Sequence, residues 1–306
     1  MTTSSVILCT RNRHDDLKRC LRSLHAQTAS AMQLIIVDSS DTPVTTDATI
    51  VQLCDQIKQK NTQVLLLHTA PGLPSQRNRG IAHAHADILY FFDDDVELEP
   101  AYLERMNEVF EQYPQFAGGM GRVMNVSKAP SWKYRLFRSF FLLSQDYASG
   151  HFTWSGMPTH VFGTHHWQSV EVLSGCCMAY RRQVFTHHVF DEQLGGYAYM
   201  EDCDFSRRVS YQSPLFFNPA ARLSHFHSPI NRDAVVKNRA MLMHNYSYLF
   251  FKNFYPKNKL KVIAYAWSVL GLLLEAVLIR RWDYLRGYWH GLRQFYRKRP
   301  NKTHQN

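Results

Sequence analysis

The sequence lacks a glycine-rich phosphate loop, paired cysteines, internal repeats and low-complexity linkers. Only 14 of its 306 residues are glycine. No stretch has the glycine spacing of a P-loop or of a dinucleotide-binding turn, so neither of these phosphate-binding classes is indicated. Its six cysteines have no paired metal-ligand spacing, and several fall in predicted core elements, which favours reduced, buried thiols. They are Cys9, Cys20, Cys54, Cys176, Cys177 and Cys203.

The first 251 residues have no excess charge of either sign. Residues 252–306 contain 12 Lys or Arg and 2 acidic residues, and 12 − 2 = +10 is the net charge of the whole chain. The remainder is balanced, with 23 basic and 23 acidic residues. A basic domain that grips nucleic acid is therefore not supported.

No signal peptide is expected, because Met1 leads almost directly into the first predicted strand. Within the basic tail, residues 262–279 are apolar with a single acidic group. Ser268, Gly271 and Glu275 recur at helical spacing and share one face. Trp282, Tyr284, Tyr288 and Trp289 follow, mixed with arginines.

This tail favours an interfacial helix on an anionic leaflet. A helix packed against the catalytic domain or a dimer interface ranks second. A membrane-spanning helix ranks third, because a span needs about twenty apolar residues. We therefore expect peripheral attachment to the cytoplasmic face of the inner membrane. A homodimer is left open.

Strands and helices alternate through the first hundred residues. Short apolar strands are predicted at 6–9, 34–37, 64–67 and 88–92, with amphipathic helices at 17–24, at 47–60 and from near 75. Asp15 or Asp16 is expected to cap the first helix. This order predicts an α/β fold with a parallel sheet.

Three consecutive aspartates, Asp93, Asp94 and Asp95, follow the last of these strands. In an extended chain Asp93 and Asp95 point to one side and Asp94 to the other. Their repulsion would be relieved by a hard divalent cation shared with a diphosphate. A solvated acidic loop is the alternative.

A second strand ends in Asp38, and the helix from near 75 carries Arg77 and Arg79. Carboxylates accept hydrogen bonds from a nucleoside, while arginine and a helix amino terminus meet phosphate. The set suits a ribonucleotide diphosphate. Taken singly, Asp38 fits a turn and the two arginines fit a solvated helix face.

Ordered motifs along residues 4–230 resemble family 2 glycosyltransferases, which are inverting, metal-dependent enzymes of bacterial type with the GT-A fold. The motifs are Thr10-Arg11-Asn12, Val37-Asp38-Ser39-Ser40, Gln76-Arg77-Asn78-Arg79-Gly80, Phe92-Asp93-Asp94-Asp95, the segment 173–182 (LSGCCMAYRR), Phe190-Asp191-Glu192 and the segment 199–205 (YMEDCDF).

The resemblance implies a mixed, mostly parallel sheet flanked by helices, and it assigns site residues. Asp95 and Asp93 would bind Mn²⁺ or Mg²⁺, with His225 or His227 completing the site. Asp202 would be the general base, with Glu201 the less favoured choice. The nucleotide sugar would contact Thr10, Arg11, Asn12, Asp38, Arg77, Asp93 and Asp94.

A base is required because a sugar hydroxyl is a poor nucleophile and must lose its proton as it attacks. Asp204, by contrast, is four residues from Arg208 and is expected to pair with it on the surface. The segment 131–170 is rich in aromatics and histidine and fits an acceptor loop, or equally a partly buried loop or membrane-proximal helix.

We therefore predict a nucleotide-sugar-binding half (1–125), an acceptor-binding half (126–230) and a basic, amphipathic helical region (231–306). The predicted activity is sugar transfer to a hydroxyl of a glycan or lipid-linked glycan in polysaccharide biosynthesis. The alternatives are a sugar-nucleotide pyrophosphorylase, disfavoured because Thr10-Arg11-Asn12-Arg13 has no glycine, and a non-catalytic membrane-bound scaffold.

Overall fold

The computed structural model describes residues 2–126, 130–145, 148–194, 198–226 and 235–298. Its contacts group the chain into two compact units. The sheet unit comprises residues 1–129, 148–151 and 160–228, and the helical unit comprises 130–147, 152–159 and 229–306. The domain boundaries predicted at 125 and 230 stay predictions.

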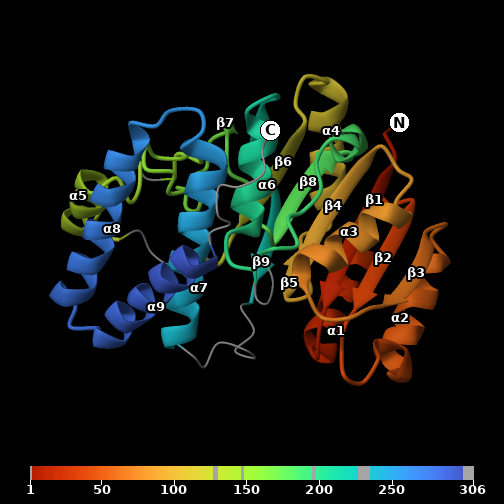
Figure 1. The fold of residues 1–306 in the computed structure, drawn as a ribbon. Coiled ribbons are helices and arrows are strands. Elements are labelled where there is room, and N and C mark those ends of the chain that lie inside the picture. Colours follow the sequence, from red (N-terminus) through yellow and green to blue (C-terminus); the bar gives the residue numbers. More distant parts are fainter. Residues whose placement is uncertain (1, 127–129, 146–147, 195–197, 227–234, 299–306) are drawn as a thin grey trace, which may run out of the picture. The chain divides into compact units, whose positions relative to one another are not determined.

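The first half of the sheet unit is a parallel sheet, as predicted. Strands β1 (Ser4–Thr10), β2 (Gln33–Asp38), β3 (Gln63–His68) and β4 (Ile88–Asp93) lie in the order β3-β2-β1-β4 (Figure 1). Thr10 lies opposite Asp38 on β2, and its neighbour Cys9 lies opposite Asp93 on β4. The carboxyl ends of three strands therefore meet at one edge, which is where open α/β sheets bind ligands.

The second half of the unit extends the same sheet with mixed strand directions. Strand β8 (Cys177–Arg181) pairs antiparallel with β4, and β6 (Gly118–Val123) joins β8 to β9 (Leu215–His225). The short strands β5 (Val96–Leu98) and β7 (Gln168–Val170) both pair antiparallel with β9. This addition brings the end of β9 beside the end of β4.

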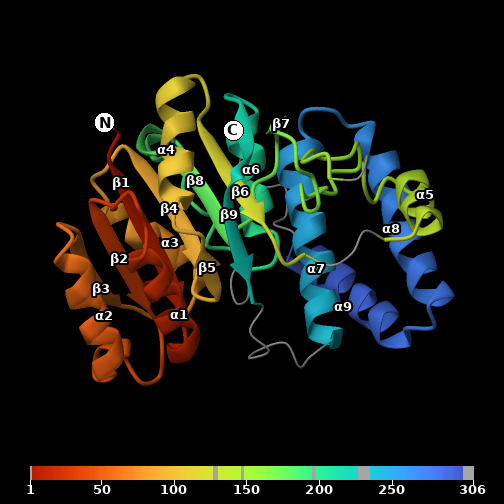
Figure 2. The ribbon, with the colours of Figure 1, turned by 180° about the vertical axis from the view of Figure 1, so that it is seen from behind.

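Helices connect and cover these strands, and Figure 2 shows them from behind. They are α1 (His14–His25), α2 (Ala48–Lys58), α3 (Leu73–His83), α4 (Tyr102–Gln112) and α6 (Glu201–Ser210), with 3₁₀ turns η1 (Val44–Thr46) and η2 (Arg182–Thr186). Asp47 caps α2. The expected cap of α1 is wrong: Arg13 holds the N-cap position without a side-chain cap, and Asp15 and Asp16 lie in the first turn. Negative charge there still suits the helix dipole.

The core of the sheet unit is made by the apolar strand runs predicted from the sequence. Phe91 and Phe92 on β4 are 1% and 2% exposed. Helix α3 lies so close to β1 that a Cβ on Gly80 would stand 2.5 Å from Ile7. A residue without a side chain is therefore needed where α3 crosses β1, and this contact fixes the position of Arg77 one turn earlier.

The helical unit contains α5 (Trp132–Phe140), α7 (Val235–Leu249), the π-helical turn η3 (Phe250–Phe254), α8 (Lys261–Leu278) and α9 (Trp282–Lys298). Helix α8 is long and apolar enough to cross a membrane, and about a third of it is buried within the protein. Its less apolar face is the packed one: Ser268 is fully buried and shares a hydrogen bond with Tyr246.

Candidate active site

Two aspartates and a histidine converge at the edge where β4 and β9 end. One ligand atom each from Asp93, Asp95 and His225 lies within 4.8 Å of the others. Nε2 of His225 is 2.9 Å from Oδ1 of Asp95 and 3.8 Å from Oδ2 of Asp93. Asp95 is 2% exposed. Two carboxylates and an imidazole at this spacing are a donor set for a divalent cation such as Mn²⁺.

Strand pairing explains why these residues meet. Strand β4 ends at Asp93, and a tight turn at Asp94 and Asp95 leads directly into β5. Because β5 pairs with β9, Val96 lies opposite His225, and the carbonyl of Asp95 accepts a hydrogen bond from the amide of Phe226. His227, the other candidate ligand, lies outside the described residues.

Asp94 does not join this cluster and makes other contacts. Its carboxylate accepts a hydrogen bond from Thr10 Oγ1 at 2.7 Å and pairs with Arg13 at 3.0 Å. Burial raises the pKa of Asp94 to about 7, although Arg13 and Thr10 act in the opposite direction. Arg13 also lies 3.5 Å from Asp95. Asp94 therefore anchors the loop after β1 to the end of β4.

The environment of His225 is strongly anionic. Burial by itself would lower the pKa of His225, but hydrogen bonds to Asp95 and Cys176 outweigh burial and raise this pKa to about 11. The electrostatic field of the cluster thus favours a cation. Ligation of a metal requires the neutral imidazole, so a divalent ion and the proton compete for this position.

A buried arginine joins the aspartate cluster to the segment that carries the predicted base. Arg77, 2% exposed, pairs with Glu201, donates to the carbonyl of Gly175 at 2.9 Å and lies 3.5 Å from Asp93. The amide of Gly175 in turn donates to Asp202 Oδ2 at 2.8 Å. One peptide segment therefore touches both the arginine and the proposed base.

Glu201 and Asp202 begin helix α6, directly after Met200 in the left-handed conformation. Glu201 is 4% exposed, and its Oε2 has no hydrogen-bond partner in the described part of the chain. Asp204 pairs with Arg208 as expected, but it is fully buried, so the expectation of a surface pair is wrong. Asp204 lies inside because α6 packs on the sheet, where Phe205 and Ser206 contact Tyr180 of β8.

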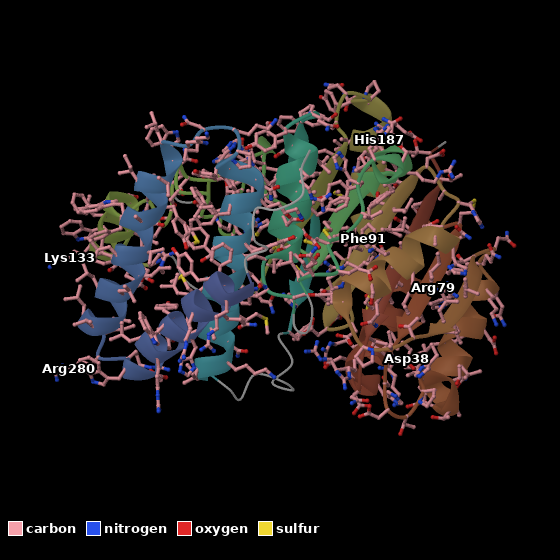
Figure 3. All side chains as sticks on the ribbon, viewed as in Figure 1. Asp38, Arg79, Phe91, Lys133, His187 and Arg280 are labelled. Carbon is pink, nitrogen blue, oxygen red and sulfur yellow. The ribbon has the colours of Figure 1, made fainter. Side chains whose placement is uncertain are left out.

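The other predicted nucleotide-binding residues lie around the same sheet edge. Asp38 is buried and accepts hydrogen bonds from the amides of Ser40 and Val44, so its carboxylate shapes the loop after β2. Asn12 has positive φ and bonds to Asp41, while Arg11 is exposed. Their roles in binding, and that of Arg77 toward phosphate, stay predictions. Figure 3 labels Asp38 and Arg79, the latter exposed on α3.

Two site residues were given no role from the sequence. Arg13 stands in the quoted loop after β1, but its pairing with Asp94 spans 81 residues. Gly175 lies where a Cβ would be 3.1 Å from Arg77 Nη2, 3.2 Å from Glu201 Oε1 and 3.3 Å from Asp202 Oδ2. The glycine in the 173–182 motif was the available signal, and the structure shows what surrounds it.

The aromatic segment 131–170 is divided between the two units. Trp132 and Phe140 are exposed on α5 in the helical unit. Trp167, in the sheet unit, packs on Phe116 and Tyr113. His160 stacks on Phe162. The prediction that this segment binds an acceptor stays a prediction.

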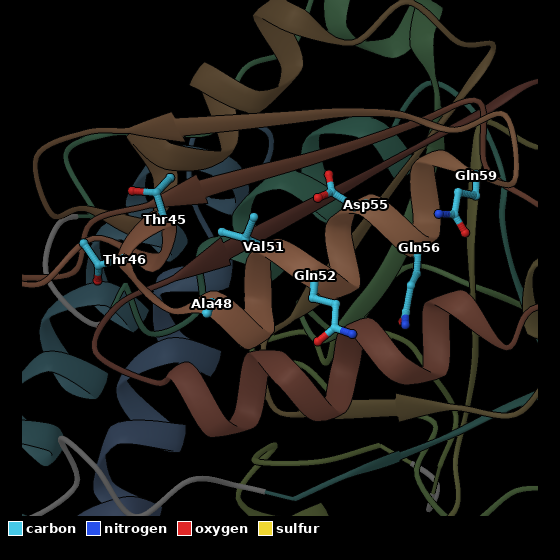
Figure 4. Close-up of a pocket in the computed structure, with 8 residues that line it drawn as sticks. All are labelled: Thr45, Thr46, Ala48, Val51, Gln52, Asp55, Gln56 and Gln59. Atoms are coloured by element: carbon cyan, nitrogen blue, oxygen red, sulfur yellow. The ribbon is translucent and has the colours of Figure 1, made fainter.

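A separate shallow hollow of about 600 Å³ lies along the outer side of α2 (Figure 4). It is lined by Thr45, Thr46, Ala48, Val51, Gln52, Asp55, Gln56 and Gln59. Asp55 already pairs with Lys58. Apart from the apolar side chains of Ala48 and Val51, its lining consists of neutral amides, hydroxyls and one paired carboxylate, which indicate no reaction, and it does not include the aspartate cluster.

Residues 5–189 match the family described as Glycosyl transferase family 2. The chain belongs to this family. An uncharacterized glycosyltransferase, YibD of Escherichia coli K12, is 33% identical over 103 residues, which are 33% of the chain and 28% of YibD. A putative glycosyltransferase, EpsH of Bacillus subtilis 168, is 27% identical over 103 residues and is covered to the same extent. The match of this chain thus covers less than a third of the length of each of these two relatives.

Solved structures show the fold of the family 2 chain. Staphylococcus aureus TarS, residues 1–349, superposes with a TM-score of 0.60 at 14% identity, covering 96% of the chain and 80% of TarS. The Pyrobaculum calidifontis mannosyltransferase PcManGT, solved with GDP-Man and Mn²⁺, has a TM-score of 0.57 at 12% identity, covering 95% of the chain and 84% of PcManGT. The predicted GT-A fold is confirmed.

Proposed function

We propose that this protein is an inverting, metal-dependent glycosyltransferase that moves a sugar from a nucleotide diphosphate to a hydroxyl of a glycan or lipid-linked glycan. The observation that carries the proposal is the convergence of the Asp93, Asp95 and His225 cluster with Asp202 through Arg77 and Gly175. A partly buried, oxygen-rich cation site linked to a carboxylate suits displacement of a diphosphate.

Asp93, Asp95 and His225 would hold the metal, which we propose to be Mn²⁺ or Mg²⁺. Their two oxygens and one nitrogen fit Mn²⁺ well, since imidazole is a reasonable ligand for it and carboxylates are preferred. When bound, the ion supplies positive charge to the oxygens of the departing diphosphate. PcManGT and GalNAc-T7 were solved with Mn²⁺, which supports this proposal.

Asp202 would act as the general base, and Glu201 is the second choice. The acceptor oxygen forms a bond to the anomeric carbon while that carbon's bond to the diphosphate oxygen breaks, and the hydroxyl proton passes to Asp202. One displacement inverts the anomeric centre. The amides of Gly175 and Cys203 donate hydrogen bonds to Oδ2 and Oδ1 of Asp202, and these bonds would hold the carboxylate in place for this transfer. Positioned bases contribute roughly 10²–10⁴-fold in rate.

The donor would bind along the sheet edge formed by the ends of β1, β2 and β4. Thr10, Arg11, Asn12 and Asp38 would face the nucleoside, and Arg77, Asp93 and Asp94 the sugar diphosphate. TarS was solved with UDP-GlcNAc and PcManGT with GDP-Man, so the relatives of known structure take different donors. The nucleotide and the sugar that this protein uses are therefore to be identified by testing a panel of donors.

The reaction would take place at the cytoplasmic face of the inner membrane in polysaccharide biosynthesis. The whole net charge of +10 lies in residues 252–306, which suits the anionic lipid of that leaflet. The family match favours sugar transfer over a sugar-nucleotide pyrophosphorylase. A non-catalytic scaffold with this fold would bind the donor and leave it intact.

The test separates donor binding from transfer. We expect Asp202→Asn to lose transfer, by about 10² or more, and to keep Mn²⁺-dependent binding of the nucleotide sugar, because the amide retains the shape. Asp95→Ala should weaken the metal-dependent binding itself. Asp15→Asn, on the exposed outer side of α1, is the matched control and should keep both. Normal transfer by Asp202→Asn would contradict the assignment of Asp202 as the base. Donor binding that is the same with and without metal would contradict the proposed metal site.

A further inference from the structure

Helices α5 and α8 of the helical unit lie side by side and run in opposite directions. Near one end of the pair, Glu275 accepts hydrogen bonds from Tyr134 at 2.6 Å and Arg138 at 3.0 Å. Near the other end, Trp267 Nε1 donates to the carbonyl of Phe140 at 2.8 Å. A Cβ on Gly271 would stand 2.4 Å from Phe141, so the backbone of α8 lies directly against the residue that follows α5.

Both helices expose apolar side chains at helical spacing. On α5 the exposed residues are four apart, and Trp132, Leu136 and Phe140 are 69%, 63% and 62% exposed. On α8 they recur at intervals of three and four: Ile263 (69%), Trp267 (38%), Leu270 (42%), Leu274 (38%), Val277 (44%) and Leu278 (69%). These nine residues are called the apolar face.

The apolar face reverses the arrangement expected for a helix on a soluble protein. The small and polar residues Ser268 and Gly271 of α8 pack inward with Tyr265 and Leu272, while the six large apolar residues of α8 named above are exposed. A water-facing helix has the opposite pattern. Exposed apolar patches that extend over several hundred Å² mark contact with a partner or a membrane. The face therefore requires an apolar occupant.

The basic side chains around the apolar face indicate what covers it. Lys133 and Arg135 on α5, and Lys257, Lys259 and Arg280 at the two ends of α8, are all exposed. Figure 3 labels Lys133 and Arg280, two of these basic residues. A symmetric dimer would bring this basic rim against its own copy. An anionic bilayer offers hydrocarbon to the face and negative headgroups to the rim.

Helix α9 has a second stripe with the chemistry of a headgroup layer. Its buried side, at Gly287, Tyr288 and Gly291, packs inside the unit. The opposite side alternates aromatic and arginine side chains: Trp282 (65% exposed), Arg286, Trp289 (66% exposed), Arg293 and Tyr296 (58% exposed). Trp and Tyr prefer the membrane–water interface, and arginine pairs with phosphate.

We propose that α5 and α8 together insert the apolar face into the outer part of an anionic lipid leaflet, with the aromatic and arginine stripe of α9 at headgroup level. Helix α8 lies in the interface and does not span, because its packed face would leave Ser268 and Glu275 without their protein partners. The new element is α5, which lies outside the 231–306 region. The inference is independent of the chemistry at Asp202.

The test measures partition onto vesicles of phosphatidylcholine with about a third phosphatidylglycerol. We expect Leu136→Glu on α5, and separately Ile263→Glu on α8, to weaken partition about tenfold or more, since charge is costly in the apolar layer. Val189→Glu replaces an equally exposed residue (59%) of the sheet unit and should partition normally. Each variant is checked for an unchanged melting temperature and for nucleotide-sugar binding.

Salt and depth distinguish insertion from attachment by charge alone. Binding through the basic tail alone should disappear at 0.5 M NaCl, whereas insertion should leave a salt-resistant fraction. Brominated acyl chains should quench the tryptophan fluorescence of the wild type, and the quenched fraction should be smaller in Trp132→Phe. Normal partition of Leu136→Glu, or full release by salt, would overturn the proposal. Lipid-free dimerisation that Leu136→Glu abolishes would instead assign the face to a second copy.

Discussion

At the scale of single residues, buried contacts between distant parts of the sequence hold the site together: Arg77 pairs with Glu201 and donates a hydrogen bond to the carbonyl of Gly175. Period-two alternation placed Asp93 and Asp95 together and Asp94 apart, and the structure confirms this grouping, although a turn rather than a strand produces it. The pairing of Arg77 with Glu201 joins residues 124 apart and leaves no local pattern. Contacts between residues so far apart in the sequence are determined by the fold. The sequence motifs therefore indicated the residues but not the contacts between them.

Gly175→Ala tests the positioning role of this buried network. The new Cβ would stand 3.1–3.3 Å from Arg77, Glu201 and Asp202, so these side-chain ends must shift by a few tenths of an ångström. We expect kcat to fall about tenfold or more through misplacement of the carboxylates, with a small change in melting temperature. Steady-state kinetics and thermal unfolding measure the two. Wild-type kcat would show that the site does not depend on this packing.

At the scale of elements, continuous apolar runs gave β1 to β4 because a buried parallel strand has that composition. The strands β5 and β7, three residues each, were too short to predict. Yet β5 is the element that brings His225 to the aspartates. For α8 the spacing placed Ser268, Gly271 and Glu275 on one face, and the structure shows that this face is the packed one, which spacing alone does not reveal.

Gly80→Ala tests the close approach of α3 to β1. Alanine favours a helix, but its Cβ would stand 2.5 Å from the buried side chain of Ile7. We expect a loss of about 1–3 kcal/mol in the free energy of unfolding from overpacking, measured by urea denaturation. Ala82→Gly, at an exposed position of the same helix, is the control and should cost about 1 kcal/mol through helix propensity alone. A Gly80→Ala protein more stable than the wild type would refute this packing argument.

At the scale of the whole molecule, the net positive charge and the candidate active site lie in different parts of the chain. The acidic cluster belongs to the sheet unit, while the excess of Lys and Arg lies in 252–306. Composition alone predicted this division, because it depends on counting and not on geometry. The two compact units could not be predicted, since residues 130–147 and 152–159 join the C-terminal helices across a long stretch of sequence.

Thermal unfolding provides a prediction at this scale. A donor that binds the folded sheet unit stabilises it by mass action, by about 2.7 kcal/mol at a hundredfold excess over Kd. We expect one nucleotide sugar from a panel to raise the melting temperature in the presence of Mn²⁺, and a chelator to remove the rise. The same rise in Asp95→Ala would contradict the assignment of the metal site.

We propose that the carboxylates after β4 and at the start of α6 carry out metal-dependent sugar transfer. Release of nucleoside diphosphate from a panel of nucleotide sugars, with Mn²⁺ and with a chelator, measures this most directly. We predict release from one donor with Mn²⁺, none with chelator, and at most about a hundredth of the rate in Asp202→Asn. Release that continues unchanged in the chelator or in Asp202→Asn would contradict it.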